Sequence, residues 1–222
     1  MGLVAPYLAF MRQDVRFAPG EGVTAVYFAK LLSGAVDWLV TVDPHLHRRA
    51  SLSEIYPMRN AVVSAAPALA DWIALNVSKP LVIGPDEESE QWAAEVAAAC
   101  SAPHVVLRKT RLGDRNVEIT APPLEHWKDR TPVLLDDIIS SAGTMALAAE
   151  KIQEAGLGAP VCIGVHGVFS PDALGTLRRA GVRRIVTTNS IEHPTNAIDV
   201  SALVARAIES IRMTEANAPR RR

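Results

Sequence analysis

Residues 133–145, which read VLLDDIISSAGTM, combine residue types that suit the binding of a sugar phosphate. Apolar residues lead into Asp136 and Asp137, and a small, hydroxyl-bearing loop follows before the helix-forming run MALAAEKIQEAG. The short apolar run favours a buried parallel strand, and the N–H groups that begin the next helix favour a bound phosphate. Acids at the carboxyl end of such a strand can accept hydrogen bonds from sugar hydroxyls. The alternative is an ordinary strand–turn–helix with surface acids. The loop consists of Ser140, Ser141, Ala142, Gly143 and Thr144.

Two clusters in the first quarter of the chain place polar side chains near apolar runs. Arg12 can clamp a phosphate through two N–H groups, and Gln13 offers an amide to a base or a ribose. Alone, this pair also fits a solvated turn. His45 follows an apolar strand that ends at Asp43, where a neutral imidazole can ligate a metal or hydrogen-bond a phosphate. A structural histidine is the alternative there.

Two clusters in the middle of the chain add acidic and basic groups. Asp86 ends the apolar run at residues 81–84, where a carboxylate could hold Mg²⁺ or cap the next helix. Lys109 and Arg111 belong to the segment LRKTRLGD, which leaves a strand for a flexible segment. Near bound phosphates they would stabilise charge that develops during transfer, and alone they would form a solvated charge run.

The elements that must position these residues alternate along the chain. Strands are expected at residues 3–5, 38–42, 81–84, 104–107, 117–119, 133–135, 161–168 and 184–187. Helices are expected at residues 23–32, 66–75, 89–100, 145–154, 172–180 and 201–213. This alternation predicts parallel α/β units. The tail at residues 214–222 ends in three arginines, and we expect it to be disordered.

Composition narrows the function classes. The chain has 222 residues, 49% of them hydrophobic, which is enough for a core in one or two domains. A net charge of −1 with 21% charged residues argues against a nucleic-acid partner. No apolar run reaches the length of a membrane span. Cys100 and Cys162, far apart in apolar surroundings, indicate buried free thiols and a reducing cytoplasm.

Five motifs in order resemble those of phosphoribosyl pyrophosphate (PRPP) synthetases, the ribose-phosphate pyrophosphokinases. PYLAFMRQD resembles the family's PYFGYARQD segment, TVDPHLHR its TVD-x-H motif, and VIGPD its SPD motif. LRKTRLGD resembles the flexible catalytic loop, and DDIISSAGTM the loop that binds ribose 5-phosphate. Phosphoribosyltransferases, which consume PRPP, share only that last loop, so the upstream motifs favour a synthetase.

The resemblance implies an α/β fold with two tandem phosphoribosyltransferase-like domains, each a parallel sheet flanked by helices. The first domain, residues 1–64, would be incomplete, and residues 65–200 would form the second. Residues 201–213 would return as a helix that packs on the first domain. The family also implies a homo-oligomer built from dimers, with a hexamer as one form.

The implied activity is that of a ribose-phosphate diphosphokinase. The 1-hydroxyl of ribose 5-phosphate attacks the β-phosphorus of Mg·ATP, and PRPP and AMP result. By motif position, Lys109 and Arg111 would be catalytic. Arg12, Gln13 and His45 would bind ATP, and His45 and Asp86 would hold Mg²⁺. Ribose 5-phosphate would be bound by Asp136, Asp137, Ser140, Ser141, Ala142, Gly143 and Thr144.

Two departures from the family pattern favour an alternative, a catalytically silent relative that binds a ribose phosphate or nucleotide. Family members begin with a further N-terminal stretch that completes the first sheet and reaches a neighbouring subunit's adenine site, and we expect strand edges to lie open without it. Glu87 and Glu88 stand where the family tends to have glycines, and their charge should disfavour a bound phosphate unless Mg²⁺ intervenes.

Overall fold

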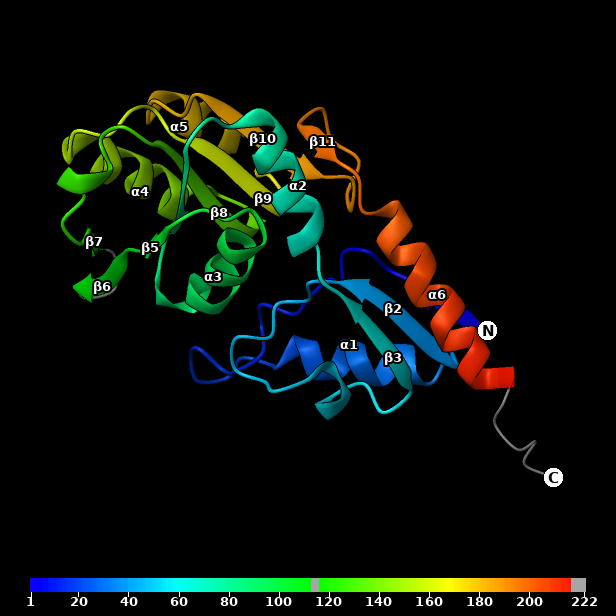
Figure 1. Ribbon diagram of the computed structural model, residues 1–222. Helices are drawn as coiled ribbons and strands as arrows, with labels where there is room; N and C mark the ends of the chain where they lie inside the picture. Colours follow the sequence, from blue (N-terminus) through cyan, green and yellow to red (C-terminus); the bar gives the residue numbers. More distant parts are fainter. Residues whose placement is uncertain (113–115, 217–222) are drawn as a thin grey trace. The chain divides into compact units, whose positions relative to one another are not determined.

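The computed structural model describes residues 1–112 and 116–216, with the backbone alone for residues 109–112, 116–118 and 214–216. The chain divides into two compact units. Residues 66–199 form one unit, and residues 1–65 with the C-terminal segment from Val200 form the other (Figure 1). The expected features at Gly113, Asp114 and residues 217–222 lie outside the described residues.

The larger unit is built on a six-stranded parallel sheet in the order β11-β10-β9-β8-β4-β5. Its long central strand is β8, which runs from Thr131 to Ile139. The other strands are β4 (Pro80–Gly84), β5 (His104–Val106), β9 (Val161–Gly167), β10 (Arg184–Thr188) and β11 (Asn196–Ile198). The helices are α2 (Ala66–Asn76), α3 (Glu90–Ala99), α4 (Gly143–Glu154) and α5 (Ala173–Arg179). Strands alternate with helices because each parallel pair needs a crossover connection.

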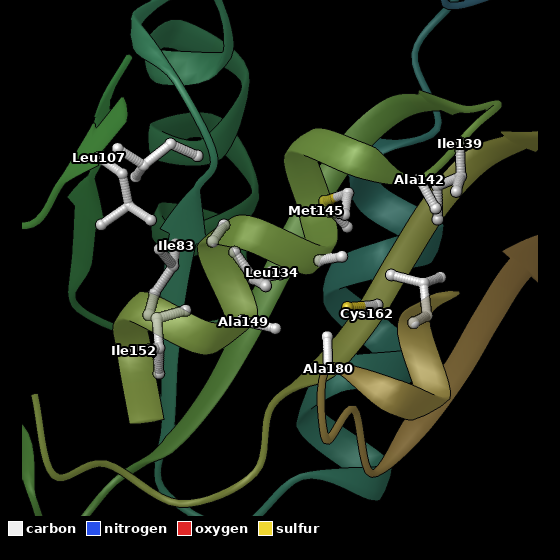
Figure 2. Close-up of a cluster of buried hydrophobic side chains, with 14 of the residues drawn as sticks. Ile83, Leu107, Leu134, Ile139, Ala142, Met145, Ala149, Ile152, Cys162 and Ala180 are labelled. Carbon is white, nitrogen blue, oxygen red and sulfur yellow. The ribbon is translucent and has the colours of Figure 1, made fainter. Parts of the chain in front are cut away.

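The packing of this sheet follows from its sequence pattern. Central strands such as β8 and β9 are buried on both faces, which explains their nearly continuous apolar runs. Leu134 and Cys162 of the sheet pack against Met145, Ala149 and Ile152 of α4 in one cluster (Figure 2). This packing fixes α4, and therefore the loop before it, against the end of β8.

A short antiparallel hairpin interrupts the α/β alternation of the larger unit. It consists of β6 (Arg108–Leu112) and β7 (Asn116–Thr120). Its base is anchored, since Leu107 and Ile119 are buried in the same apolar cluster as α4. Two single turns of 3₁₀ helix complete the unit, η2 (Glu87–Ser89) and η3 (Glu125–Trp127).

The smaller unit holds a three-stranded parallel sheet in the order β1-β2-β3. Its elements are β1 (Gly2–Val4), α1 (Thr24–Ser33), β2 (Trp38–Val42), η1 (Leu52–Glu54), β3 (Arg59–Val63) and α6 (Ser201–Ala216). Ala25 and Ala29 of α1 pack with Leu39 of β2 and Tyr56 in one buried cluster. The C-terminal helix α6 contacts β2 and β3, and its Val204 and Ile211 are buried.

Several elements differ from the sequence-based expectation. Strand β8 continues through Asp136 and Asp137 to Ile139, so the two acids lie within the strand and not after it. The sequence analysis also missed β3, β6 and β11. These strands are three to five residues long, and only pairing with a neighbouring strand defines them.

Among the described residues, no helix combines the length and the apolar character that crossing a bilayer requires.

Candidate functional site

The loop between β8 and α4 has the geometry of an anion site. Ala142 adopts a left-handed conformation (φ 64°) at the N-cap of α4, where no side chain caps the helix. Its own side chain is buried, whereas Ser141 and Gly143 on either side are exposed. The N-terminus of α4 therefore carries partial positive charge at a solvent-accessible position, where a phosphate binds well.

Neighbouring elements hold this loop in place. The backbone N–H of Ser170 donates to the carbonyl oxygen of Ser140 at 3.2 Å. Ile139, the last residue of β8, fills the space beside Gly164 of β9, where an added Cβ would lie 2.7 Å from its Cγ1. The loop is thus fixed at its first residue by the segment after β9 and at Ala142 by the core.

Asp136 and Asp137 are half-buried just before this loop. The Oδ1 atom of Asp136 accepts a hydrogen bond from the backbone N–H of Asp137 at 3.0 Å. Successive residues of a strand point to opposite faces, so the two carboxylates leave β8 in different directions. They therefore offer two separate acceptors and not a single paired carboxylate site.

Asp86 follows β4, the parallel neighbour of β8, so it lies at the same edge of the sheet as the loop of residues 140–142. It occupies the N-cap position of η2, yet its side chain makes no capping hydrogen bond, and Ser89 instead donates to its backbone carbonyl at 2.5 Å. The capping role that the sequence allowed is therefore not its role here. A carboxylate supplies the oxygen ligands that Mg²⁺ prefers, so the chemistry of Asp86 fits that ion.

Glu87 lies beside the base of the β6–β7 hairpin. Its Oε1 is 3.8 Å from Nε of Arg108, and both side chains are mostly exposed. They line a cavity of about 490 Å³ along β5, together with Glu90 and His104. Lys109 and Arg111 follow within β6, and their side chains lie outside the described part of the structure.

In the smaller unit, Arg12 and Gln13 lie on a turn after β1. Arg12 is exposed, between the buried residues Met11 and Asp14. The Nε2 atom of Gln13 donates to Oε2 of Glu21 at 3.1 Å and to the carbonyl of Val15 at 3.3 Å. The amide N–H groups thus point into the turn, and this was not evident from the sequence.

The segment after β2 carries His45. Asp43 begins it in a left-handed conformation (φ 31°), and its Oδ2 accepts the N–H of Ala65 at 2.8 Å. Asp43 is therefore a structural tie to the end of β3. The rings of His45 and His47 meet edge to face, with centroids 4.1 Å apart.

The structure joins these two segments of the smaller unit through residues that the sequence analysis did not select. Nη1 of Arg48 lies 3.1 Å from Oδ1 of Asp14, although 34 residues separate the two. Ser170 and Glu21 were also missed. Nothing in their local sequence distinguishes them from ordinary surface residues, because their role depends on long-range contacts.

Comparison with known proteins identifies the class of protein to which this chain belongs. The family model described as the phosphoribosyl transferase domain matches residues 51–205. A crystal structure of phosphoribosylpyrophosphate synthetase from Mycobacterium smegmatis shares the fold, with a TM-score of 0.80 and 23% identity, over 96% of this chain and 72% of that one. The chain is thus a phosphoribosyltransferase-type α/β protein.

Comparison with relatives in sequence identifies the family within this class. The ribose-phosphate pyrophosphokinase of Methanopyrus kandleri is 36% identical over 211 residues, which are 94% of this chain and 71% of the relative. That of Sulfurisphaera tokodaii is 31% identical, over 92% of this chain and 71% of the relative. The chain belongs to the ribose-phosphate pyrophosphokinase family.

Proposed function

We propose that this protein is a ribose-phosphate diphosphokinase that makes PRPP and AMP from ribose 5-phosphate and Mg·ATP for nucleotide biosynthesis. The observation that carries the proposal is the loop of residues 140–144 at the start of α4, which follows the two acids of β8 after Ile138 and Ile139, in a chain of this family. We extend the proposal to a cytoplasmic homo-oligomer built from dimers, with a hexamer as one form.

The loop residues bind the 5-phosphate of the sugar. Backbone N–H groups of Gly143 and Thr144 and the hydroxyls of Ser140, Ser141 and Thr144 supply donors at the N-terminus of α4. Asp136 and Asp137 accept hydrogen bonds from the ribose hydroxyls. Both contacts hold the 1-hydroxyl in one place, which is the main requirement of a phosphoryl-type transfer.

Asp86 of the larger unit holds the Mg²⁺ that accompanies ATP, and in the smaller unit His45 is the candidate ligand for that ion or for ATP. That ion neutralises charge on the phosphate oxygens and orients the diphosphoryl group. Arg12 binds the nucleotide from the turn after β1, and Gln13 shapes that turn. Because Nε2 of Gln13 already donates to Glu21, its carbonyl oxygen is the group left to read the nucleotide.

Lys109 and Arg111 belong to β6 and would act on the transferring group. The 1-hydroxyl oxygen forms a bond to the β-phosphorus while the bond to the α-phosphate oxygen breaks and AMP departs. Cationic side chains stabilise the negative charge that spreads over the phosphate oxygens in this step.

The direct test is to incubate the purified protein with ATP, Mg²⁺ and ribose 5-phosphate and to measure PRPP and AMP. Equal amounts of both products support the proposal. ADP in place of AMP would contradict diphosphoryl transfer. Binding of ribose 5-phosphate with no product would favour the catalytically silent relative, for which Glu87 and Glu88 are the specific observation.

Lys109→Ala should reduce kcat on the order of a hundredfold or more while leaving ribose 5-phosphate affinity nearly unchanged, because the lysine acts on transition-state charge. Steady-state kinetics and equilibrium binding separate the two effects. A loss of affinity as large as the loss of rate would contradict a catalytic role for Lys109.

A further inference from the structure

Asp14 is a buried carboxylate one position beyond the Arg12–Gln13 turn. Its side chain is only 1% exposed. Nη1 of Arg48 lies 3.1 Å from its Oδ1 and 3.4 Å from its Oδ2. A buried carboxylate needs such a partner, because leaving it unpaired in a low-dielectric site is costly.

Arg48 and its neighbour hold this segment at three points. The guanidinium carbon of Arg48 also lies 5.8 Å from the ring centroid of Phe17, within the range of a cation–π contact. Nη2 of Arg49 donates to the backbone carbonyl of Asp14 at 3.4 Å. Arg49 is in turn paired with Glu54 at 3.6 Å, so the segment that contacts Asp14 is itself tied down.

Other hydrogen bonds also hold this turn. The carbonyl of Gln13 accepts the N–H of Ala25, at the start of α1. Glu21 accepts from the Gln13 side chain and from the backbone N–H of Phe17. Arg12 is exposed and lies between buried Met11 and buried Asp14, so the backbone on both sides of it is anchored.

We propose that Arg48 is a positioning residue for the nucleotide: by clamping Asp14 it fixes the direction of Arg12 and joins the Arg12 turn to the segment that carries His45. The inference rests on the proposed use of ATP. Because Nη1 of Arg48 lies beside both carboxylate oxygens of Asp14, we expect the guanidinium to act through Asp14.

The test compares Arg48→Met, Asp14→Asn, the double variant and Arg48→Lys in the otherwise intact protein. Loss of the Arg48–Asp14 pair should raise both the Kd and the KM for ATP on the order of tenfold to a hundredfold, because misplaced binding groups lose affinity steeply. The kcat and the KM for ribose 5-phosphate should stay within about twofold. Arg48→Lys should restore part of the loss, since a lysine keeps the charge but not the planar fork.

Two further comparisons separate the clamp from a general effect of removing an arginine. Arg179→Met is the matched control, because Arg179 pairs with Asp172 at 2.7 Å on an exposed face of α5. Hydrogen exchange at residues 12–18 measures the turn without any ATP, and Arg48→Met should accelerate it whereas the control should not.

The proposal is supported if both single variants weaken ATP binding alike and the double variant is no worse than either. Weakened binding in Arg48→Met alone would indicate direct contact with ATP and overturn it. Equal losses of affinity for ATP and for ribose 5-phosphate would show that Arg48 contributes only to stability, and would overturn the proposal. If the unsubstituted protein binds no ATP, the proposed function fails as well, whereas normal ATP use by every variant refutes the clamp alone.

Discussion

Asp136 illustrates how the environment of a single residue bears on its proposed role. It is half-buried, and one of its oxygens already accepts the N–H of Asp137, so its orientation is set before any sugar arrives. A fixed acceptor loses little conformational freedom on binding, which favours affinity. In Gln13, by contrast, the amide N–H groups already donate within the turn, so binding a ligand through them would first require breaking those hydrogen bonds.

Asp136→Asn should therefore weaken ribose 5-phosphate binding roughly tenfold to a hundredfold, since a hydrogen bond to a charged group contributes about 1.5–3 kcal/mol. Calorimetric titration with ribose 5-phosphate measures the change. Asp129→Asn is the control, because Asp129 is an exposed acid paired with Lys79 at 3.0 Å. Unchanged affinity in Asp136→Asn would remove this residue from the sugar site.

At the scale of elements, the strand–loop–helix unit of β8 and α4 depends on one backbone conformation. Ala142 stands at a positive φ, and its methyl group is buried against the core. A left-handed conformation costs an alanine about 1–2 kcal/mol, and burial of the methyl group returns about 0.8 kcal/mol of this. Ala142→Gly should accordingly change stability by less than about 1 kcal/mol, and the phosphate site should survive.

Ala142→Val should instead destabilise the protein by more than about 2 kcal/mol, because a β-branched residue is strongly disfavoured at this φ and has no room in the core. Urea unfolding of both variants measures the difference. Ribose 5-phosphate binding should be lost in the valine variant at temperatures where it is still folded. A valine variant as stable as the alanine protein would show that the loop adopts another conformation.

The connection between β4 and α3 carries the second departure from the family. The ion pair of Glu87 with Arg108 spans 3.8 Å between exposed side chains, so it contributes at most about 1 kcal/mol. Replacing Glu87 and Glu88 together by glycine should lower the Tm by only a few degrees, mainly because each glycine costs about 0.5–1 kcal/mol in backbone entropy. It should lower the KM for Mg·ATP several-fold, since two negative charges near the phosphates are removed. Glu125→Gln, on η3, is the control, and an unchanged KM would make both acids bystanders.

For the molecule as a whole, burial of ionisable groups links stability to alkaline pH. Burial raises the pKa of the Cys162 thiol well above its ordinary 9.0, and the charge of Asp136 raises it further. Burial also raises the pKa of Tyr56 to about 12, from 10.0. Both groups stay neutral in the folded state at a pH where they ionise in the unfolded chain. Their contribution to folding stability is therefore intact below their ordinary pKa values, and it is lost as pH rises through their pKa values in the folded state.

The free energy of unfolding should thus fall as pH rises from 9 to 11, with no corresponding loss between pH 7 and 8. Urea titrations at each pH measure it. Cys162→Ala should flatten the earlier part of this decline, near pH 9–10, because the unfolded chain then has one thiol fewer to ionise. An identical pH profile in the alanine variant would show that Cys162 is not the group responsible.

The sequence alone determined the residue types, their spacing and the alternation of strands and helices. Helix and strand periodicity are local properties, and the proposed phosphate-binding motif at residues 136–144 is continuous, so both can be read from neighbouring residues. The long helices α2 and α6 and the strand β2 were predicted to within a few residues for the same reason.

Only the tertiary structure decided which residues act together. The Arg48–Asp14 pair, the Ser170–Ser140 hydrogen bond and the Glu87–Arg108 pair each join segments far apart in sequence. Strand order and register bring such segments together, and no local pattern encodes them. The extension of β8 through its two acids follows from pairing with β9, which runs as far as Ile139 opposite Gly167.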